Sequence, residues 1–313
     1  MRQLFPDPSG AGQIAWNGDS FDSPRQDGVL AYPMPGGPSG WNDGLTDFLE
    51  ESSGGRHPID LASIDVAMLN IYKYSKFIEK WEGGGGGTRI IEIGCSGGHL
   101  LRRLRRGLPG AMVVGADIIG APLKRLAGKL RDEGMATPLL RFDLADCPLP
   151  DRSFDLVVAL NVLEHIADHG KAAAEIYRIL KPGGVFVFEV PAGPGLYDDY
   201  DRDMRHYRRY RAREIDQLLT QTGFARKSLS HLGVFMYPAF WLIKKLRAAA
   251  AAKKAGTPAP NPDAGPSVSS KRLISASNGI FFRLPLALEI WLGRFVNWPF
   301  GIRCTGAYIR PKT

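Results

Sequence analysis

The sequence predicts an α/β protein in which helices cover both faces of a doubly wound, mostly parallel sheet with an antiparallel last strand. From residue 88 onward, short apolar runs alternate with amphipathic stretches, which is typical of buried parallel strands joined by helices. A glycine-rich turn follows the first of these runs, where such a sheet binds its ligand. The composition agrees, because 44% hydrophobic and 23% charged residues are near the averages of globular domains.

Two segments precede the predicted sheet. Residues 1–56 are rich in Gly, Pro, Asp and Ser, so we expect a flexible N-terminal tail with one short docking helix at 41–51. Apolar residues at helical spacing predict a helical cap over 57–82, and the pentaglycine at 83–87 ends it as a hinge. We read residues 1–40 as mobile.

The core is expected over 88–231 and continues in a final strand at the C-terminus. Its predicted strands are 89–93, 111–117, 137–142, 154–160, 185–190 and a weaker one at 225–231. Its predicted helices are 99–106, 122–133, 171–180 and 211–222. Residues 301–313 hold the final strand, which we place at the edge of the sheet.

An insertion at 232–300 separates the core from that final strand. It contains two apolar stretches, 234–247 and 284–300, on either side of a low-complexity segment at 248–270 that we expect to be flexible. Each stretch is shorter than the roughly 20 residues that span a bilayer. They either form a lid on the sheet or lie at a membrane interface with their basic residues at the headgroups.

Charge is unevenly distributed along the chain. The first 60 residues hold nine acids and three arginines, whereas residues 202–313 hold 20 Lys and Arg and five acids. The basic third indicates either an anionic partner or a solvated face, and the absence of a binding module disfavours nucleic acid. Three dispersed cysteines and the lack of a signal-peptide pattern predict a cytoplasmic protein, with peripheral contact to the inner face of the membrane as an option.

The strongest chemical signal is the turn at 90–99 (IIEIGCSGGH). Glycines let the backbone approach a ligand closely, and the following helix directs its free N–H groups to the same place. Asp117 ends the second strand, where a carboxylate can accept both hydroxyls of a ribose, and Asp143 follows the third strand near an adenine edge. A dinucleotide fingerprint would need glycine at two places where this chain has Ser96 and His99.

Residues 88–190 resemble a class I S-adenosylmethionine-dependent methyltransferase of the broad type 11 kind, which implies a Rossmann-like fold. The motifs that carry the resemblance are EIGCSGG (92–98), VVGAD (113–117), DLADCPLPDRSFDLVVALNVLEHI (143–166) and LKPGGVFVFEVP (180–191). Weaker similarity continues in HYRRY (206–210). The end, WPFGIRCTGAYIRP (298–311), resembles relatives associated with glycan or lipid biosynthesis.

The resemblance implies S-adenosylmethionine as the cofactor and ten residues that hold it. These would line its methionine, ribose and adenine parts: Glu92, Gly94, Cys95, Ser96, Gly98, Asp117, Ile118, Asp143, Leu144 and Asn161. The chain departs from the family pattern at Ser96, where relatives have glycine. A serine fits there if its φ is negative, and it could otherwise crowd the cofactor.

Methyl transfer requires alignment and, where the acceptor must lose a proton, a general base. We expect His165 and His206 as catalytic residues: His165 ends the fourth-strand motif, and His206 lies on the loop after the fifth strand. The acids at 198–201 lack calcium-loop spacing and are expected to be solvated, so no metal site is predicted. The arginines of 205–213 either grip an anionic group or are solvated, with Arg208 paired to those acids.

The predicted function is O-methylation of a small-molecule, glycan or lipid-linked acceptor by an S-adenosylmethionine-dependent methyltransferase. Carbon and nitrogen acceptors stay open. A second hypothesis is a non-catalytic subunit that binds the cofactor or recruits the protein to a membrane. A third is a nucleotide-dependent oxidoreductase, which Ser96 and His99 oppose because they break its glycine fingerprint.

Overall fold

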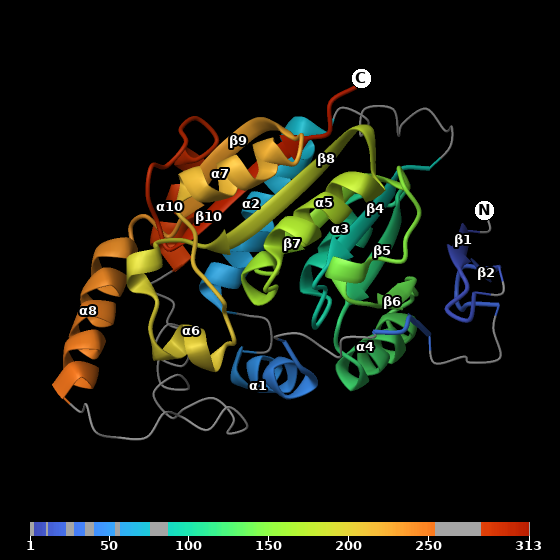
Figure 1. The fold of residues 1–313 in the computed structure, drawn as a ribbon, viewed down its shortest axis with the longest axis horizontal. Coiled ribbons are helices and arrows are strands. Elements are labelled where there is room, and N and C mark those ends of the chain that lie inside the picture. Colours follow the sequence, from blue (N-terminus) through green and yellow to red (C-terminus); the bar gives the residue numbers. More distant parts are fainter. Residues whose placement is uncertain are drawn as a thin grey trace.

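The computed structural model describes residues 3–10, 12–22, 28–34, 41–53, 57–75, 87–253 and 283–312. Its centre is an eight-stranded sheet of order β3-β6-β5-β4-β7-β8-β10-β9 (Figure 1). The strands are β3 (Val29–Ala31), β4 (Arg89–Ile93), β5 (Met112–Asp117), β6 (Leu139–Arg141), β7 (Phe154–Leu160), β8 (Leu180–Pro191), β9 (Ala225–Leu232) and β10 (Arg303–Ile309). β10 runs antiparallel to both neighbours and the other pairings are parallel, which confirms the predicted fold class.

Side chains of the central strands alternate between two separate hydrophobic cores, one on each face of the sheet. Ile90 and Val113 belong to one core, and their chain neighbours Ile91 and Val114 belong to the other. The helices against the first face are α2 (Pro58–Tyr74), α3 (His99–Gly107) and α4 (Ala121–Asp132). Those against the second are α5 (His169–Ile179) and α7 (Ala212–Gln221). The near-continuous apolar strands of the sequence reflect this burial on both faces.

The N-terminal segment is more regular than its composition suggests. β1 (Gln3–Pro6) and β2 (Gln13–Trp16) form an antiparallel hairpin whose Phe5 and Trp16 are buried in the second core. β3 pairs in parallel with β6 at the edge of the main sheet. The expectation of a mobile tail is therefore wrong for these residues, because a three-residue strand is too short for a periodicity argument to detect.

The final strand does not lie at the edge of the sheet. β10 is hydrogen-bonded to β8 on one side and to β9 on the other, so β9 forms the edge. Cys304, Ala307 and Tyr308 are fully buried between these neighbours. The sequence predicted the strand but placed it wrongly, since the apolar pattern of a strand does not say which partner it pairs with.

The C-terminal insertion contributes two helices, α8 (Tyr237–Lys253) and α10 (Arg283–Leu292). α8 stands apart at the left of Figure 1, beside the short helix α6 (Asp199–Asp203). Its backbone continues to Lys253, so the flexible segment predicted from 248 begins too early, and 254–270 lies outside the described residues. Most of the pentaglycine also lies outside them. Within the described ranges, no helix has the length and apolar character needed to cross a bilayer.

Candidate active site

The chain changes direction at β4, because β5 and β6 lie on one side of it and β7 and β8 on the other. Ligands of open α/β sheets bind at the carboxyl ends of the strands beside such a reversal. Here that position is the turn after β4, where the N–H groups of Gly94 and Cys95 both donate to the carbonyl of Ala116. Gly98, at φ +75°, is the N-cap of helix α3, so the turn and the helix N-terminus face one place.

Ser96 has a φ of +43°, in the left-handed region, so the condition of a negative φ under which a serine fits without strain is not met. The turn imposes this conformation, because the backbone N–H of Ser96 donates to Oδ2 of Asp117 at 2.7 Å. A left-handed conformation costs a residue with a Cβ about 1–2 kcal/mol. The serine is therefore accommodated, at the expense of local strain.

Replacing Ser96 with glycine is expected to relieve this strain and raise the free energy of unfolding by up to about 1 kcal/mol. Chemical denaturation of the two proteins measures the difference. Ser9→Gly, at an exposed turn residue with no left-handed φ, serves as the control and should not stabilise. A destabilised Ser96→Gly would mean that the serine side chain makes contacts that outweigh the strain.

Asp117 ends β5 with its carboxylate buried beside this turn. Oδ2 accepts the N–H of Ser96, and Oδ1 accepts the N–H groups of Ile118 and Ile119, at 2.7 and 3.3 Å. Burial raises the pKa of Asp117, and these three backbone hydrogen bonds oppose the rise. Because a carboxylate has about four acceptor positions, one stays available to a ligand hydroxyl.

One cavity of about 390 Å³ runs from this turn into the protein. It is within the range of about 300–1,000 Å³ that is usual for small-molecule sites. It brings together nine of the twelve residues expected from the sequence: Gly94, Ser96, Asp117, Ile118, Asp143, Leu144, Asn161, His165 and His206. It does not reach Glu92, Cys95 or Gly98. Glu92 and Cys95 are both buried, and burial raises the pKa of the Glu92 carboxyl and of the Cys95 thiol.

Helix α1 (Asp43–Ser53) lies over the end of the cavity at the glycine turn, and it corresponds to the docking helix predicted at 41–51. The carboxylate of Asp43 accepts the N–H groups of Gly120 and Ala121 at the start of α4, at 2.7 and 2.9 Å. Glu50 contacts His99 of α3 at 3.2 Å. A Cβ on Gly97 would lie 2.1 Å from Oε1 of Glu50, so a larger residue at this position would displace the Glu50 carboxylate.

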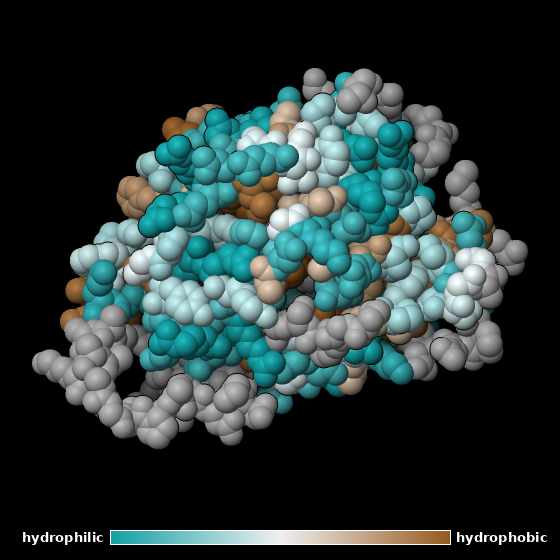
Figure 2. All heavy atoms as spheres, viewed as in Figure 1, coloured by the Kyte–Doolittle hydropathy of each residue, from teal (hydrophilic) through white to brown (hydrophobic). Residues whose placement is uncertain are grey.

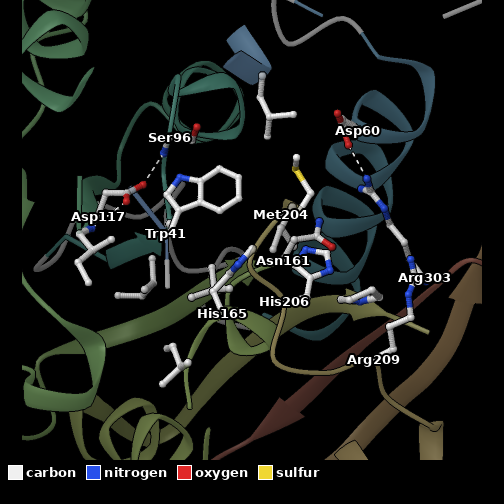
Figure 3. A pocket seen from close by; sticks show the side chains of 18 of the residues that line it. Trp41, Asp60, Ser96, Asp117, Asn161, His165, Met204, His206, Arg209 and Arg303 are labelled. Carbon is white, nitrogen blue, oxygen red and sulfur yellow. Dashed lines mark hydrogen bonds and ion pairs between the residues drawn. The ribbon is translucent and has the colours of Figure 1, made fainter. Parts of the chain in front are cut away.

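Two histidine rings lie in the middle of the cavity (Figure 3). The ring centroids of His165 and His206 are 4.7 Å apart, and the ring of Trp41 packs on His165 at 4.6 Å. Burial and the nearby His206 lower the pKa of His165 to about 3. His165 is therefore neutral and a weak base at neutral pH, which counts against the sequence argument that its pKa suits proton transfer.

His206 is held by a carboxylate that the sequence analysis placed in solvent. Asp201 is fully buried, accepts a hydrogen bond from Nδ1 of His206 at 2.9 Å and pairs with Arg209 at 2.8 Å. Lys244 of α8 contacts its other oxygen at 3.1 Å. Burial alone would raise the pKa of Asp201, but His206 and the two cations hold it well below its usual range. The expectation of a solvated acidic loop is therefore wrong.

The arginines of the basic run also differ from expectation. Arg208 donates to the carbonyl of Ala167 at 2.7 Å, whereas Arg209 is the one that pairs with the acidic loop. Hydrophobic periodicity cannot predict which of these two adjacent arginines is buried, because both lie in a loop. The contact between Asp201 and His206 had one signal in the sequence, which is that the two residues are only five positions apart.

The inner end of the cavity is lined by a second ion network, in which Glu189 is fully buried and the Asp60 side chain is 46% exposed. Arg303 at the start of β10 pairs with Asp60 at 2.6 Å and with Glu189 at 2.9 Å (Figure 3). Glu189 also accepts a hydrogen bond from Asn161 at 3.1 Å. Asp60 and Arg303 were not predicted as a pair, because they lie 243 positions apart and meet only where α2 packs against β10.

Among the described residues, Glu164, His165 and His206 could together hold a metal ion, since ligand atoms of all three lie within 4.8 Å of one another. The Glu164 carboxylate is fully buried, and neither of its oxygens has a hydrogen-bond partner. Burial raises the pKa of Glu164 to about 8, so the carboxyl is protonated at neutral pH. The sequence analysis predicted no metal site, and that prediction stays open.

The raised pKa makes the stability of the protein depend on pH. Because folded Glu164 holds its proton up to about pH 8 and the unfolded group releases it near 4.5, stability falls as pH rises through this window. Glu164→Gln should remove a slope of up to about 1.4 kcal/mol per pH unit. Denaturation of both proteins at several pH values measures it. Equal slopes would show that Glu164 is ionised in the folded protein.

Together, the sheet, the glycine turn and the buried acid at the end of β5 define an α/β domain that binds a nucleotide-like ligand. Residues 91–188 match the family model described as a methyltransferase domain. A Mycolicibacterium smegmatis protein named as a probable S-adenosylmethionine-dependent methyltransferase is 32% identical over 160 residues, 48% of this chain and 56% of that protein. The sterol 24-C-methyltransferase of Aspergillus fumigatus is 32% identical over 132 residues, 40% of this chain and 33% of that enzyme.

The chain thus spans about half or less of the length of these curated relatives. Among solved structures, a Galdieria sulphuraria protein described as a sarcosine dimethylglycine methyltransferase covers 86% of this chain and 99% of its own. It has a TM-score of 0.57 and 14% identity, so this likeness concerns the fold alone. Residues 91–188 are thus similar to S-adenosylmethionine-dependent methyltransferases, and the sheet and its helices have the Rossmann-like fold of such enzymes.

Proposed function

We propose that this chain transfers a methyl group from S-adenosylmethionine to a hydroxyl group on an acceptor held at the inner end of the cavity. One observation carries the proposal: a single cavity connects Asp117 beside the glycine turn with His206 and continues to Arg303. Donor and acceptor can therefore meet next to a base, which is what transfer to a protic group requires.

The residues at the outer end fit the cofactor. Asp117 offers an acceptor position for a ribose hydroxyl, and Asp143 and Leu144 line the cavity on the neighbouring strand end. The side chain of Asp143 accepts the N–H of Ala145, which fixes its orientation at the start of a short helix. Apolar groups such as Phe142 and Ile166 supply the rest of the wall, as a flat heteroaromatic ring needs.

The bound cofactor supplies a methyl group on a positively charged sulfur and leaves as a neutral thioether. His206 supplies the base: with Nδ1–H donated to Asp201, Nε2 carries the lone pair that accepts the acceptor proton. Asp201 fixes this tautomer and stabilises the charged ring after the transfer. His165 and Trp41 pack beside it and exclude water from the reacting groups.

The inner end favours an acceptor with an apolar body. Met204, Met236, Phe240 and Ile302 line it, and its arginines are already paired with buried carboxylates. Because these carboxylates already compensate their charge, the arginines would bind a phosphate group only weakly. We therefore expect the site to recognise the hydroxyl of the acceptor.

The test is incubation with S-adenosylmethionine labelled with tritium in its methyl group, together with hydroxylated small molecules, glycans and extracted polar lipids. We expect label in a methyl ether product, identified by mass spectrometry, and much less label when Asp117→Ala replaces the wild type. Label on carbon would place the chain with C-methylating relatives such as the sterol enzyme. Tight cofactor binding without any transfer would favour the non-catalytic alternative.

A further inference from the structure

Helices α8 and α10 carry an exposed apolar surface. Of the 15 exposed large hydrophobic side chains in the described part of the chain, 11 lie in residues 235–246 and 284–300. Leu246, Leu284 and Phe295 are 61%, 79% and 75% exposed. We call these two segments the α8–α10 surface; its α8 part lies at the left of Figures 1 and 2. A concentration of this kind marks an interaction site, because single exposed apolar residues are normally scattered.

The charges on the α8–α10 surface all have one sign. Lys245 and Arg294 are its exposed charged side chains with described positions, and both are cations; Arg283, directly before its second segment, is an exposed cation as well. Its one acidic residue, Glu289, is buried and accepts the N–H of Gly233 at 2.7 Å. Aromatic side chains lie among these cations, as Trp291 packs against Phe295 at 5.8 Å and Lys245 lies over Trp241 at 5.9 Å. An anionic lipid surface matches this combination of apolar, aromatic and cationic groups.

The opposite side of α8 reaches the cavity. Phe240, on α8, and Met236, just before it, line the inner end of the cavity, and Lys244 contacts Asp198 and Asp201 at 2.5 and 3.1 Å. Asp201 in turn holds His206. One helix therefore links the exposed surface with the wall of the acceptor site and with the buried charges that position the base.

We propose that the α8–α10 surface docks on an anionic bilayer and that the acceptor is lipid-linked, with its hydroxyl group beside His206 and its apolar part along Met236 and Phe240 toward α8. The choice of acceptor rests on the proposed function, whereas the docking does not. A bilayer rather than a protein is favoured because every exposed charge described on this surface is positive and the apolar residues spread over two helices.

Co-sedimentation with vesicles tests the docking directly. The double variant Leu242→Glu/Leu288→Glu places charge on α8 and α10, where both leucines are 51% exposed. Leu4→Glu, at a leucine that is 52% exposed on β1, is the matched control. At low salt, the wild type and Leu4→Glu should sediment with phosphatidylcholine–phosphatidylglycerol vesicles, and the double variant at least tenfold more weakly. Vesicles of phosphatidylcholine alone should bind all three proteins less.

Two results would overturn the proposal. The first is equal sedimentation of the wild type and the double variant, or no sedimentation of either. The second is a wild-type dimer in light scattering that the double variant converts to a monomer, since the surface would then bind a second copy of the chain. Stabilisation by S-adenosylhomocysteine should be unchanged in all variants, which separates failure of the docking from failure of the proposed function.

Discussion

Replacing His206 with asparagine is expected to lower kcat by about 10²–10⁴-fold, the usual contribution of a general base. Affinity for S-adenosylhomocysteine should change little, because His206 lies outside the glycine turn, where we expect the cofactor to bind. Steady-state kinetics with the acceptor found by the labelling experiment, together with calorimetric titration of S-adenosylhomocysteine, separate the two effects. His231→Asn, at a histidine bound to the carbonyl of Trp298 and outside this cavity, is the control.

The pH profile distinguishes a base from a residue that only supports the fold. Burial lowers the pKa of His206, and Asp201 opposes the shift without reversing it. His206 is therefore neutral above a pKa that lies below the ordinary value of about 6.5. The rate of the wild type should rise with pH through that pKa, and the variant should lack this acidic limb. An unchanged kcat with the limb intact would exclude His206 as the base.

Replacing Asp117 with alanine is expected to weaken S-adenosylhomocysteine binding by about 1–3 kcal/mol, because the ribose hydroxyls lose a buried acceptor. This corresponds to roughly 5- to 150-fold in the dissociation constant. The variant also loses the hydrogen bonds that fix Ser96 and Ile118, which weakens the turn itself. Isothermal titration calorimetry measures the change.

Asp117→Asn keeps the shape of the side chain and one acceptor oxygen, so it should lose less affinity than the alanine variant. Asp65→Ala, on α2 and away from the cavity, should bind like the wild type. Circular dichroism checks that each variant is folded. Wild-type affinity in both folded Asp117 variants would remove the carboxylate from the cofactor site.

The sequence predicted the parts of the fold that depend on local pattern. The buried strands β4, β5, β7 and β8 are continuous apolar runs, and Asp117 stands at the end of one of them. Pairing between distant segments leaves no such pattern, so the position of β10 inside the sheet was not predicted. The same limit applies to α1, whose contact with the start of α3 joins Glu50 to His99, 49 positions further along the chain.

Buried charge was the least predictable feature of the site. Asp201 and Arg209 lie in a stretch so rich in acids and arginines that solvation was the natural expectation. In the structure, Lys244 from the insertion completes their network, and no local signal links residues 43 positions apart. Glu92 shows the opposite error: its motif predicted ligand contact, but the residue is buried within the strand and does not line the cavity.

Thermal unfolding with S-adenosylhomocysteine, S-adenosylmethionine or NAD tests most directly the central claim that this cavity binds the methyl donor. A ligand at 100 times its dissociation constant should stabilise the protein by about 2.7 kcal/mol. The two adenosyl sulfur compounds should raise the unfolding temperature of the wild type and much less that of Asp117→Ala, and NAD should have no effect. No shift with either adenosyl compound, or an equal shift with NAD, would contradict the claim.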